Sequence, residues 1–295
     1  MIENKSIGSR IFDKFNIVLM IFIGLLSLYP LWYALCLSFS SQYAVNAGLV
    51  MFYPVGFNLE SYKVIMSDSG FFQSFWISVE RTFLGVVITM VMLVMMGYPL
   101  SKTTREFRMR NVLMWLVMFC MLFNGGTIPW YIVMKKYGLI NSIWGLVLGG
   151  GLPVFNLILL INFFRSLPAE LEEAAIMDGG NPWQILFRIV LPCAKPVLAT
   201  VVLFVAVGHW NDYFQGLVLA TEEKYYPLQT YIKQFVVNIS QTTGLSAEQI
   251  SSISNLNNKS LNAAKVFISM IPMLIVYPFL QKYFVNGIML GSVKG

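Results

Sequence analysis

The stretch LEEAAIMDGGNPWQILFRIVLP, from Leu171 to Pro192, is a polar interruption in an otherwise apolar sequence. It holds three carboxylates, two adjacent glycines, an Asn-Pro pair and one arginine, and it lies between two of the longest apolar runs. Backbone groups in lipid must be satisfied within regular helices, so residues that cap or break helices do not suit a membrane interior. The stretch therefore predicts a structure at the membrane surface, and the runs around it decide the fold class.

The composition of the chain is that of a membrane protein. Of the 295 residues, 57% are hydrophobic and 12% are charged, and the mean hydropathy is +0.68. Soluble domains carry about 25% charged residues. The sequence therefore predicts an all-α polytopic membrane protein. Its net charge of +6 is interpreted as a bias of cytoplasmic loops rather than as a sign of binding to nucleic acid.

Six apolar runs are long enough to cross a bilayer as helices, which takes about 20 residues each. Pro30 lies inside the first run, and residues 149–151, three glycines, interrupt the fourth together with Pro153. The predicted spans are about Phe15–Phe39, Thr82–Leu100, Asn111–Met134, Gly138–Phe164, Pro196–Ala220 and Ala264–Phe284.

Lysine and arginine are denser in one set of loops than in the other, and this bias sets the orientation. With the N-terminus inside, the inner segments hold 12 of the 20 basic residues, so both termini are expected in the cytoplasm. The chain then divides into an N-terminal part with the first helix and first external loop (1–73), a membrane core (74–285) and a cytoplasmic tail (286–295). The core includes the inner polar loop at about 165–196.

The external loops are too long to be simple connectors. Residues 40–73 mix aromatic and polar side chains, and residues 221–262 are rich in serine, asparagine and glutamine. Ser246 and Gln249 have the spacing of a capping box, which predicts a short helix there. We interpret the second loop as a contact surface for an external protein, with flexible padding as the alternative.

The sequence holds no pattern of a catalytic or metal site. Cys36, Cys120 and Cys193 have no CxxC or Cys/His spacing, and His209 is the only histidine. The triple glycine lacks the lysine of a nucleotide-binding P-loop. No paired carboxylates or nucleophile–base pattern indicate a membrane enzyme. We therefore expect no enzyme activity and no cofactor on this chain.

The order of residue types in the polar stretch predicts two helices joined by a tight turn. A proline can open the first helix, carboxylates suit its first turns, and a glycine pair ends it. An Asn-Pro pair can then cap and begin the second helix. Two adjacent alanines leave a smooth side against which another protein could pack. The residues of this pattern are Pro168, Glu170, Glu172, Glu173, Ala174, Ala175, Gly179, Gly180, Asn181, Pro182, Pro192 and Pro196.

The stretch resembles the EAA loop of ABC-importer permeases, whose usual form is E-A-A-x-x-D-G-A followed by I-x-L-P. The chain departs from that form at Gly180, where the family more often has alanine. The resemblance covers about Ser74 to Gly295 and implies a type I ABC importer transmembrane domain with six helices. In that family the loop docks on a separate ATPase subunit, which binds ATP and magnesium. The coupling residues it implies here are Glu173, Ala174, Ala175, Asp178, Gly179, Gly180 and Pro192.

Trp210 to Phe214 and Leu290 to Gly295 resemble carbohydrate importers, specifically the maltose-permease-like inner subunit. Asn124 to Tyr131, with Tyr137 to Leu139, is similar to a branch that handles oligosaccharides and polysaccharide fragments. The resemblance implies a bacterial plasma-membrane complex of two homologous permeases, two ATPases and an extracellular solute-binding protein. It also implies a C-terminal tail that reaches the ATPase dimer. Spans nearly free of lysine and arginine favour an uncharged sugar as cargo.

The segment from His209 to Tyr213 is the candidate translocation pathway. Asp212 is the only carboxylate within a predicted span, and such residues usually face a cavity. Asn211 and Asp212 are expected to face the lumen and bind hydroxyls, with Trp210 at the rim, while Trp210 and Tyr213 offer flat faces to a sugar ring. The alternative is a structural polar cluster without sugar contact. His209 is interpreted as a hydrogen-bonding partner between helices rather than a proton carrier.

Three other functions stay open. An ABC permease of this kind could carry an amino acid, a peptide or a polyol. An ion-coupled secondary transporter would act alone, but it needs several buried ionisable residues along a path, and Asp212 is a single one. A membrane enzyme would need catalytic groups that the sequence does not show. The expected partners are a second permease, two ATPase subunits, a solute-binding protein, a sugar and membrane lipid, without nucleic acid.

Overall fold

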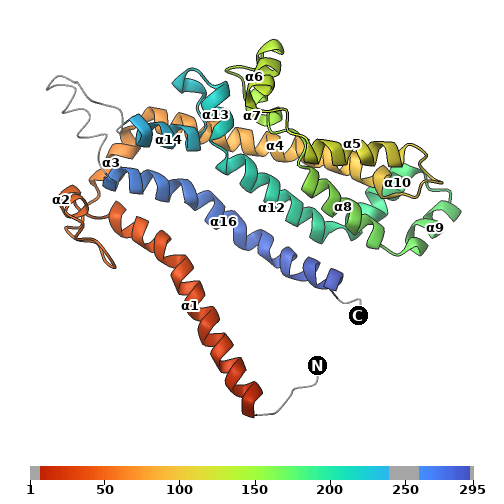
Figure 1. Ribbon diagram of the computed structural model, residues 1–295, viewed down its shortest axis with the longest axis horizontal. Helices are drawn as coiled ribbons and strands as arrows, with labels where there is room; N and C mark the ends of the chain where they lie inside the picture. The colour runs from red at the N-terminus through yellow and green to blue at the C-terminus, as the bar shows by residue number, and fades with distance from the viewer. Residues whose placement is uncertain (1–6, 239–258, 293–295) are drawn as a thin grey trace. The chain divides into compact units, whose positions relative to one another are not determined.

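The computed structural model describes residues 7–238 and 259–292, and within these ranges the chain is helical with connecting turns (Figure 1). It forms two compact units, residues 1–68 with 234–270 and residues 69–233 with 271–295. Unit 1 holds α1 (Ile7–Ser38), α2 (Gln42–Asn46) and α3 (Glu60–Ser67). Both units take residues from α14 (Leu228–Asn238) and α16 (Lys259–Ser292).

Unit 2 holds most of the helices. They are α4 (Ser69–Ser101), α5 (Arg110–Leu122), α6 (Thr127–Lys136), α7 (Ile143–Leu148), α8 (Val154–Ser166), α9 (Ala169–Met177), α10 (Pro182–Ile185), the π-helix η1 (Leu186–Val190), α11 (Leu191–Cys193), α12 (Lys195–Asn211), α13 (Phe214–Leu219) and the 3-10 helix η2 (Glu223–Tyr225).

Three helical stretches of the described residues are long and apolar enough to cross a membrane, namely Ile11–Ser38, Ser69–Ser101 and Lys259–Pro278. Three pairs of helices pass the same test only together, because each pair is bent at a short break, by 115°, 70° and 82°. The described chain therefore has three spans, or six if each bent pair is one span, in agreement with the predicted all-α membrane fold.

Hydrogen bonds and an ion pair hold unit 1 together. They join α1 to the segment that follows it, and α16 to α3 and to Asp68. The indole N–H of Trp32 donates to the carbonyl of Phe52 at 2.8 Å. The Ser61 and Ser260 hydroxyls lie 3.0 Å apart, and the buried Lys265 ammonium pairs with Asp68 at 3.0 Å. Because the ammonium is buried, this ion pair is what allows a charged residue inside α16.

The core of unit 2 forms where α8 and α12 pack along α4. Leu93, Leu157, Leu160 and Val201 are completely buried in this cluster. Gly97 permits the close approach of α8, since a Cβ atom there would lie 3.3 Å from the Leu160 side chain. Burying these aliphatic side chains between helices fixes α4, α8 and α12 as the frame on which the polar residues below are placed.

The third predicted span, from about Asn111 to Met134, is bent in the structure. α5 ends at Leu122 and α6 begins at Thr127, with a bend of 115° between them. Gly126 adopts φ +86°, a conformation that suits glycine, and its N–H donates to the Asn124 side chain at 2.9 Å. Local turn chemistry therefore ends the helix although the composition stays apolar.

The predicted bounds of the second and fifth spans also differ from the structure. α4 begins at Ser69 rather than at Thr82, so Glu80 and Arg81 lie inside the helix. The fifth span is not continuous, because α12 ends at Asn211 and α13 begins at Phe214. The break in the fourth span is confirmed, since residues 149–153 separate α7 from α8.

Part of the sequence interpretation falls on residues that the structure does not describe. The capping box predicted at Ser246 and Gln249 lies in residues 239–258, and the end of the predicted tail lies in residues 293–295. Both lie outside the described residues.

Candidate functional site

A buried arginine is the centre of a polar cluster in unit 2. The Arg81 side chain on α4 is 1% exposed, and its guanidinium makes four hydrogen bonds. Nε donates to the Leu146 carbonyl at 3.0 Å, and Nη1 donates to the Asp212 carbonyl at 2.8 Å. Nη2 donates to the Asp212 carboxylate at 2.5 Å and to Gln215 Oε1 at 2.9 Å. One side chain thus joins α4 to α7 and to the break between α12 and α13.

Asp212 occupies that break and organises both helix ends. Its backbone N–H donates to the Gly208 carbonyl and closes α12. Its Oδ1 accepts the backbone N–H of Phe214 at 2.9 Å and lies 3.4 Å from the N–H of Gln215, so it satisfies the first donors of α13. Aspartate favours such positions because its short carboxylate competes for nearby backbone donors. The remaining oxygen, Oδ2, faces Arg81.

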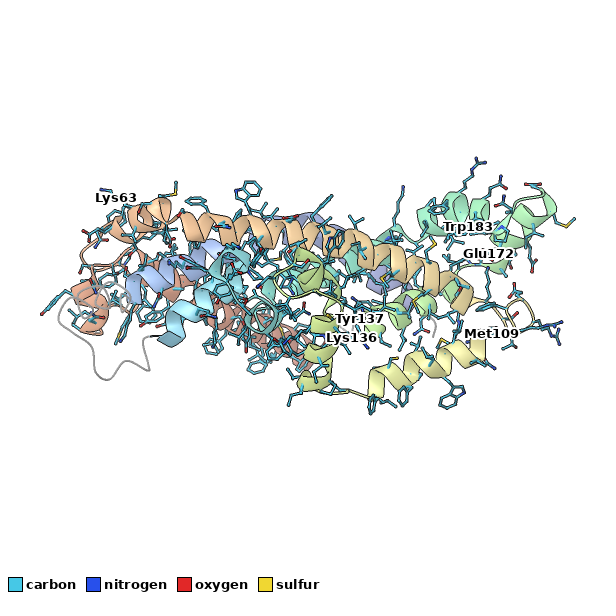
Figure 2. All side chains as sticks on the ribbon, turned by 90° about the horizontal axis from the view of Figure 1, so that it is seen from above. Lys63, Met109, Lys136, Tyr137, Glu172 and Trp183 are labelled. Carbon is cyan, nitrogen blue, oxygen red and sulfur yellow. The ribbon has the colours of Figure 1, made fainter. Side chains whose placement is uncertain are left out.

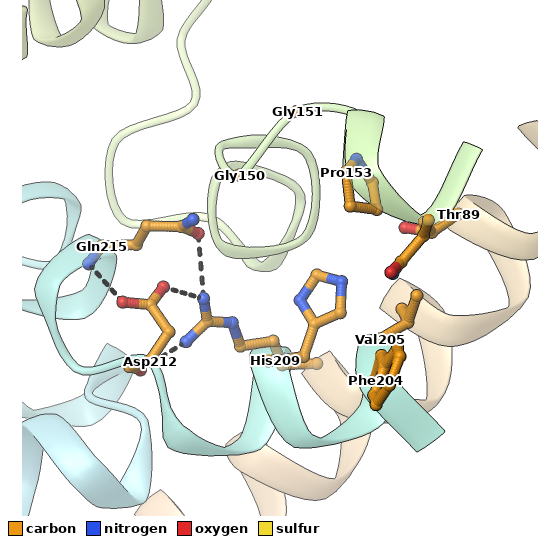
Figure 3. A pocket seen from close by; sticks show the side chains of 12 residues that line it. Thr89, Gly150, Gly151, Pro153, Phe204, Val205, His209, Asp212 and Gln215 are labelled. Atoms are coloured by element: carbon orange, nitrogen blue, oxygen red, sulfur yellow. Dashed lines mark hydrogen bonds and ion pairs between the residues drawn. The ribbon is translucent and has the colours of Figure 1, made fainter. Parts of the chain in front are cut away.

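The cluster lines a cavity of about 210 Å³. Figure 3 shows the His209 ring projecting toward the loop that carries Gly150 and Pro153, with Thr89 on the far side of the cavity from Gln215. Gly85 of α4 makes room for this ring, since a Cβ atom there would lie 2.5 Å from His209 Nε2. The polar lining residues are Arg81, Thr89, Asn156, His209, Asp212 and Gln215.

The arrangement suits hydrogen bonding to a neutral ligand and no bond-breaking chemistry. Four of the five guanidinium N–H groups are directed at protein oxygens, and the Arg81 charge is balanced by Asp212. The hydroxyl of Thr89, the amide of Asn156 and the imidazole of His209 are groups that can bind hydroxyls. The lining contains no nucleophile beside a base.

Of the four residues expected to form the pathway, Asp212 alone lines this cavity. Trp210 is buried and packs edge-on against Phe75, with ring centroids 5.8 Å apart, so it braces α12 against α4. Asn211 is exposed and lies outside the cavity lining. The Tyr213 ring is partly exposed and faces the Lys233 ammonium at 5.6 Å.

Sequence reasoning missed Arg81, Thr89, Asn156 and Gln215. Arg81 precedes the predicted start of the second span by one residue, so it was counted with an external loop. One signal was present, because an aspartate inside a span requires a partner, and Arg81 directly precedes a predicted span. Thr89, Asn156 and Gln215 carry no comparable local signal.

The second candidate feature is the helical turn between α9 and α10, near the C-terminal end of α4. Its local structure is the one that the sequence predicts. α9 ends at Met177, and Gly179 adopts φ +77°. Asn181 and Gln184 form a reciprocal capping box at 2.9 and 3.0 Å, with Pro182 as the first residue of α10. Pro168 caps α9 rather than beginning it.

The turn presents a mixed acidic and apolar surface. Glu173, Ala174, Asp178 and Gly179 are exposed, as is Pro192, whereas Ala175 and Gly180 are partly buried. Met177 is 86% exposed and Trp183 is 61% exposed, so this surface also carries large apolar side chains. Figure 2 shows Glu172 and Trp183 at the same end of unit 2 as Met109.

An ion pair ties this turn to α4. The Lys102 ammonium contacts the Glu172 carboxylate and lies 4.4 Å above the centroid of the Tyr98 ring. Burial lowers the pKa of Lys102, and the nearby charge of Glu106 opposes that shift. Hydrogen bonds from the Thr103 side chain and backbone lower the pKa of Glu106. The pair therefore links α9 to the residue that directly follows α4.

Comparison with known proteins gives consistent matches. A family model described as "binding-protein-dependent transport system inner membrane component" matches residues 70–290. Protein LplC of Bacillus subtilis (strain 168) is 37% identical over 288 residues, covering 98% of this chain and 96% of LplC. The polygalacturonan/rhamnogalacturonan transport system permease protein YtcP of the same organism is 37% identical over 287 residues, covering 97% of this chain and 99% of YtcP.

A solved structure is similar over nearly the whole chain. It is a crystal structure of a bacterial ABC transporter involved in the import of the acidic polysaccharide alginate. The matched chain is 37% identical, with a TM-score of 0.83, covering 95% of this chain and 98% of that one.

Proposed function

Because this chain belongs to the family of binding-protein-dependent transport system inner membrane components, we propose that it is the permease of an ATP-driven importer of oligosaccharides or polysaccharide fragments. The chain is a multi-pass membrane component and not an enzyme. The observation that carries the cargo class is the match to YtcP, a polygalacturonan/rhamnogalacturonan transport permease by its name, along almost the full length of both chains.

The helical turn between α9 and α10 couples the permease to its ATPase. Glu173, Ala174 and Asp178 form the exposed docking surface, while Gly179 and Gly180 shape the turn behind it. Pro192 is exposed at the start of the following helices and limits how that segment can bend. The ATPase holds ATP and magnesium, and its movement reaches α4 through the Lys102–Glu172 pair.

The polar cavity around Asp212 forms part of the translocation pathway. Its neutral hydrogen-bonding groups suit sugar hydroxyls, and its Arg81–Asp212 pair carries no net charge. Trp210 braces α12 beside it, while Asn211 and Tyr213 are exposed and lie outside its lining. A polar cavity among apolar helices is the expected form of a solute site in a membrane protein.

The complete transporter contains a second homologous permease, two ATPase subunits and an extracellular solute-binding protein. Both termini lie in the cytoplasm, which places the turn on the ATPase side and the N-terminal end of α4 on the outside. Basic residues are denser in the segments that this orientation puts inside.

Reconstitution tests this function. The complex is purified from its native membrane by a tag on this chain, and its subunits are identified by mass spectrometry. Proteoliposomes with the binding protein are then given labelled oligosaccharides from rhamnogalacturonan, with a labelled amino acid and a polyol as controls. ATP-dependent uptake of the oligosaccharides is expected. Uptake of a control alone would overturn the cargo class, and uptake driven by an ion gradient without ATP would overturn the importer class.

A further inference from the structure

A second cavity of unit 2 lies at the N-terminal part of α4, away from the helical turn. It has a volume of about 450 Å³ and is lined from three elements: α4, the start of α7, and η2. This volume is within the range of about 300–1,000 Å³ that small-molecule sites occupy. We name it the Trp144 cavity, after the aromatic residue that α7 contributes to it.

The walls of the Trp144 cavity are fixed by hydrogen bonds between distant segments. The Asn141 side chain donates to the Thr221 hydroxyl and accepts the Thr221 backbone N–H, both at 2.7 Å. Asn141 holds φ +54°, the only positive φ of a non-glycine residue in the described chain. Gln73 donates to the Lys224 carbonyl at 3.1 Å and so ties η2 to α4. These hydrogen bonds hold the segments around the cavity in fixed positions, so the fold determines its shape.

Two of its lining groups have no partner among the residues that the structure describes. The Glu80 carboxylate makes neither an ion pair nor a hydrogen bond there, and the Trp144 side chain makes no hydrogen bond and no ring contact. Trp144 is 47% exposed although it stands at the first turn of α7. An indole that keeps a free face and a free N–H beside a free carboxylate can bind a ligand.

The chemistry of these groups selects the class of ligand. An aromatic face packs against the apolar C–H face of a sugar ring, while carboxylate and amide oxygens accept hydrogen bonds from its hydroxyls. The one cation at the rim, Lys224, is paired with Glu222 at 2.7 Å and stacks on Tyr225 at 4.9 Å. Glu80 therefore leaves the cavity with an uncompensated negative charge, which favours hydroxyls over a cargo carboxylate at this position.

We propose that the Trp144 cavity is a second carbohydrate-binding subsite, which receives one uncharged sugar ring of the cargo before it reaches the cavity at Asp212. Arg81 stands between the two cavities, because it contacts the Leu146 carbonyl and Leu146 lines the Trp144 cavity. The subsite rests on the proposed carbohydrate cargo. Trp144 supplies the stacking face, and Glu80 and Gln73 accept and donate hydrogen bonds at the ring edge.

Photolabelling of the whole transporter tests the subsite. A diazirine-tagged oligosaccharide from rhamnogalacturonan is irradiated with the reconstituted complex, and the modified peptides are mapped by mass spectrometry. Labels are expected within residues 141–146 and 224–225. Trp144→Ala should lower this labelling about tenfold, and Trp144→Phe should keep most of it, since the ring face is retained.

Trp76→Ala is the matched control, because Trp76 is an exposed tryptophan of α4 that does not line the cavity, although other residues of α4 do. It should leave the labelling unchanged. Labels confined to other parts of the transporter, or labelling equal in Trp144→Ala and wild type, would overturn the subsite while uptake by the wild type still supports the cargo. Absence of oligosaccharide uptake by the wild type would overturn the cargo and the subsite together.

Discussion

The Arg81 guanidinium donates hydrogen bonds to both the carboxylate and the carbonyl of Asp212, a residue 131 positions later in the chain. Because Arg81 is 1% exposed, its charge is compensated by that carboxylate rather than by water. The Asp212 carboxylate in turn uses one oxygen for the charge and the other for the start of α13. The same residue therefore neutralises a buried cation and interrupts the helix beside the cavity.

Asp212→Asn should destabilise the permease by about 3 kcal/mol, because removing one partner leaves the buried Arg81 charge uncompensated. Asparagine keeps the oxygen that caps Phe214, so the helix break itself should survive. Thermal unfolding of the purified complex measures the loss. The double variant Arg81→Met with Asp212→Asn should lose less stability than the sum of the two single variants. Strict additivity would show that the pair does not interact.

Gly85→Ala should damage the cavity, because the new Cβ atom would lie 2.5 Å from His209 Nε2 and push the imidazole aside. Overpacking of this kind costs about 1–3 kcal/mol. Gly208→Ala is the control, since a Cβ atom there meets nothing within 4 Å and alanine favours a helix over glycine by about 1 kcal/mol. The unfolding temperature of Gly208→Ala should be higher than that of the wild type, and that of Gly85→Ala should be lower. The reverse order would contradict this packing.

Gly179→Val should weaken assembly with the ATPase. Gly179 has φ +77° and open space around its Cα, so the cost comes from the backbone alone, at about 1–2 kcal/mol. Asparagine tolerates this conformation, and Gly179→Asn should therefore retain most of the ATPase during purification. The measurement is the ratio of ATPase to permease after tag purification. Full retention of the ATPase by Gly179→Val would show that the turn geometry does not govern docking.

Breaking the Lys102–Glu172 pair should separate ATP hydrolysis from transport. The pair is partly buried, with side chains 18% and 23% exposed, so Glu172→Gln should cost about 1–3 kcal/mol of stability. The docking surface at Glu173 and Asp178 stays intact, and receptor-stimulated ATPase activity should persist while sugar uptake per ATP falls. The exchange Lys102→Glu with Glu172→Lys should restore part of the coupling. An unchanged uptake-to-ATP ratio in Glu172→Gln would remove the pair from the coupling route.

The sequence by itself determined the membrane class and the local form of the turn between α9 and α10. Runs of apolar residues identify spans because a bilayer demands about 20 of them in sequence. The Asn181–Gln184 capping box and the positive φ at Gly179 involve residues within a few positions of one another. Such features depend on the backbone preferences of neighbouring residues, which the sequence displays directly.

Only the tertiary structure decided which polar groups meet. Apolar composition continues through the break between α5 and α6, so hydropathy alone does not show the 115° bend. Arg81, Thr89, Asn156 and Gln215 come from three helices and share one cavity because α8 and α12 pack along α4. Contacts between residues far apart in sequence depend on packing and on the pairing of buried charge, and neither leaves a local pattern.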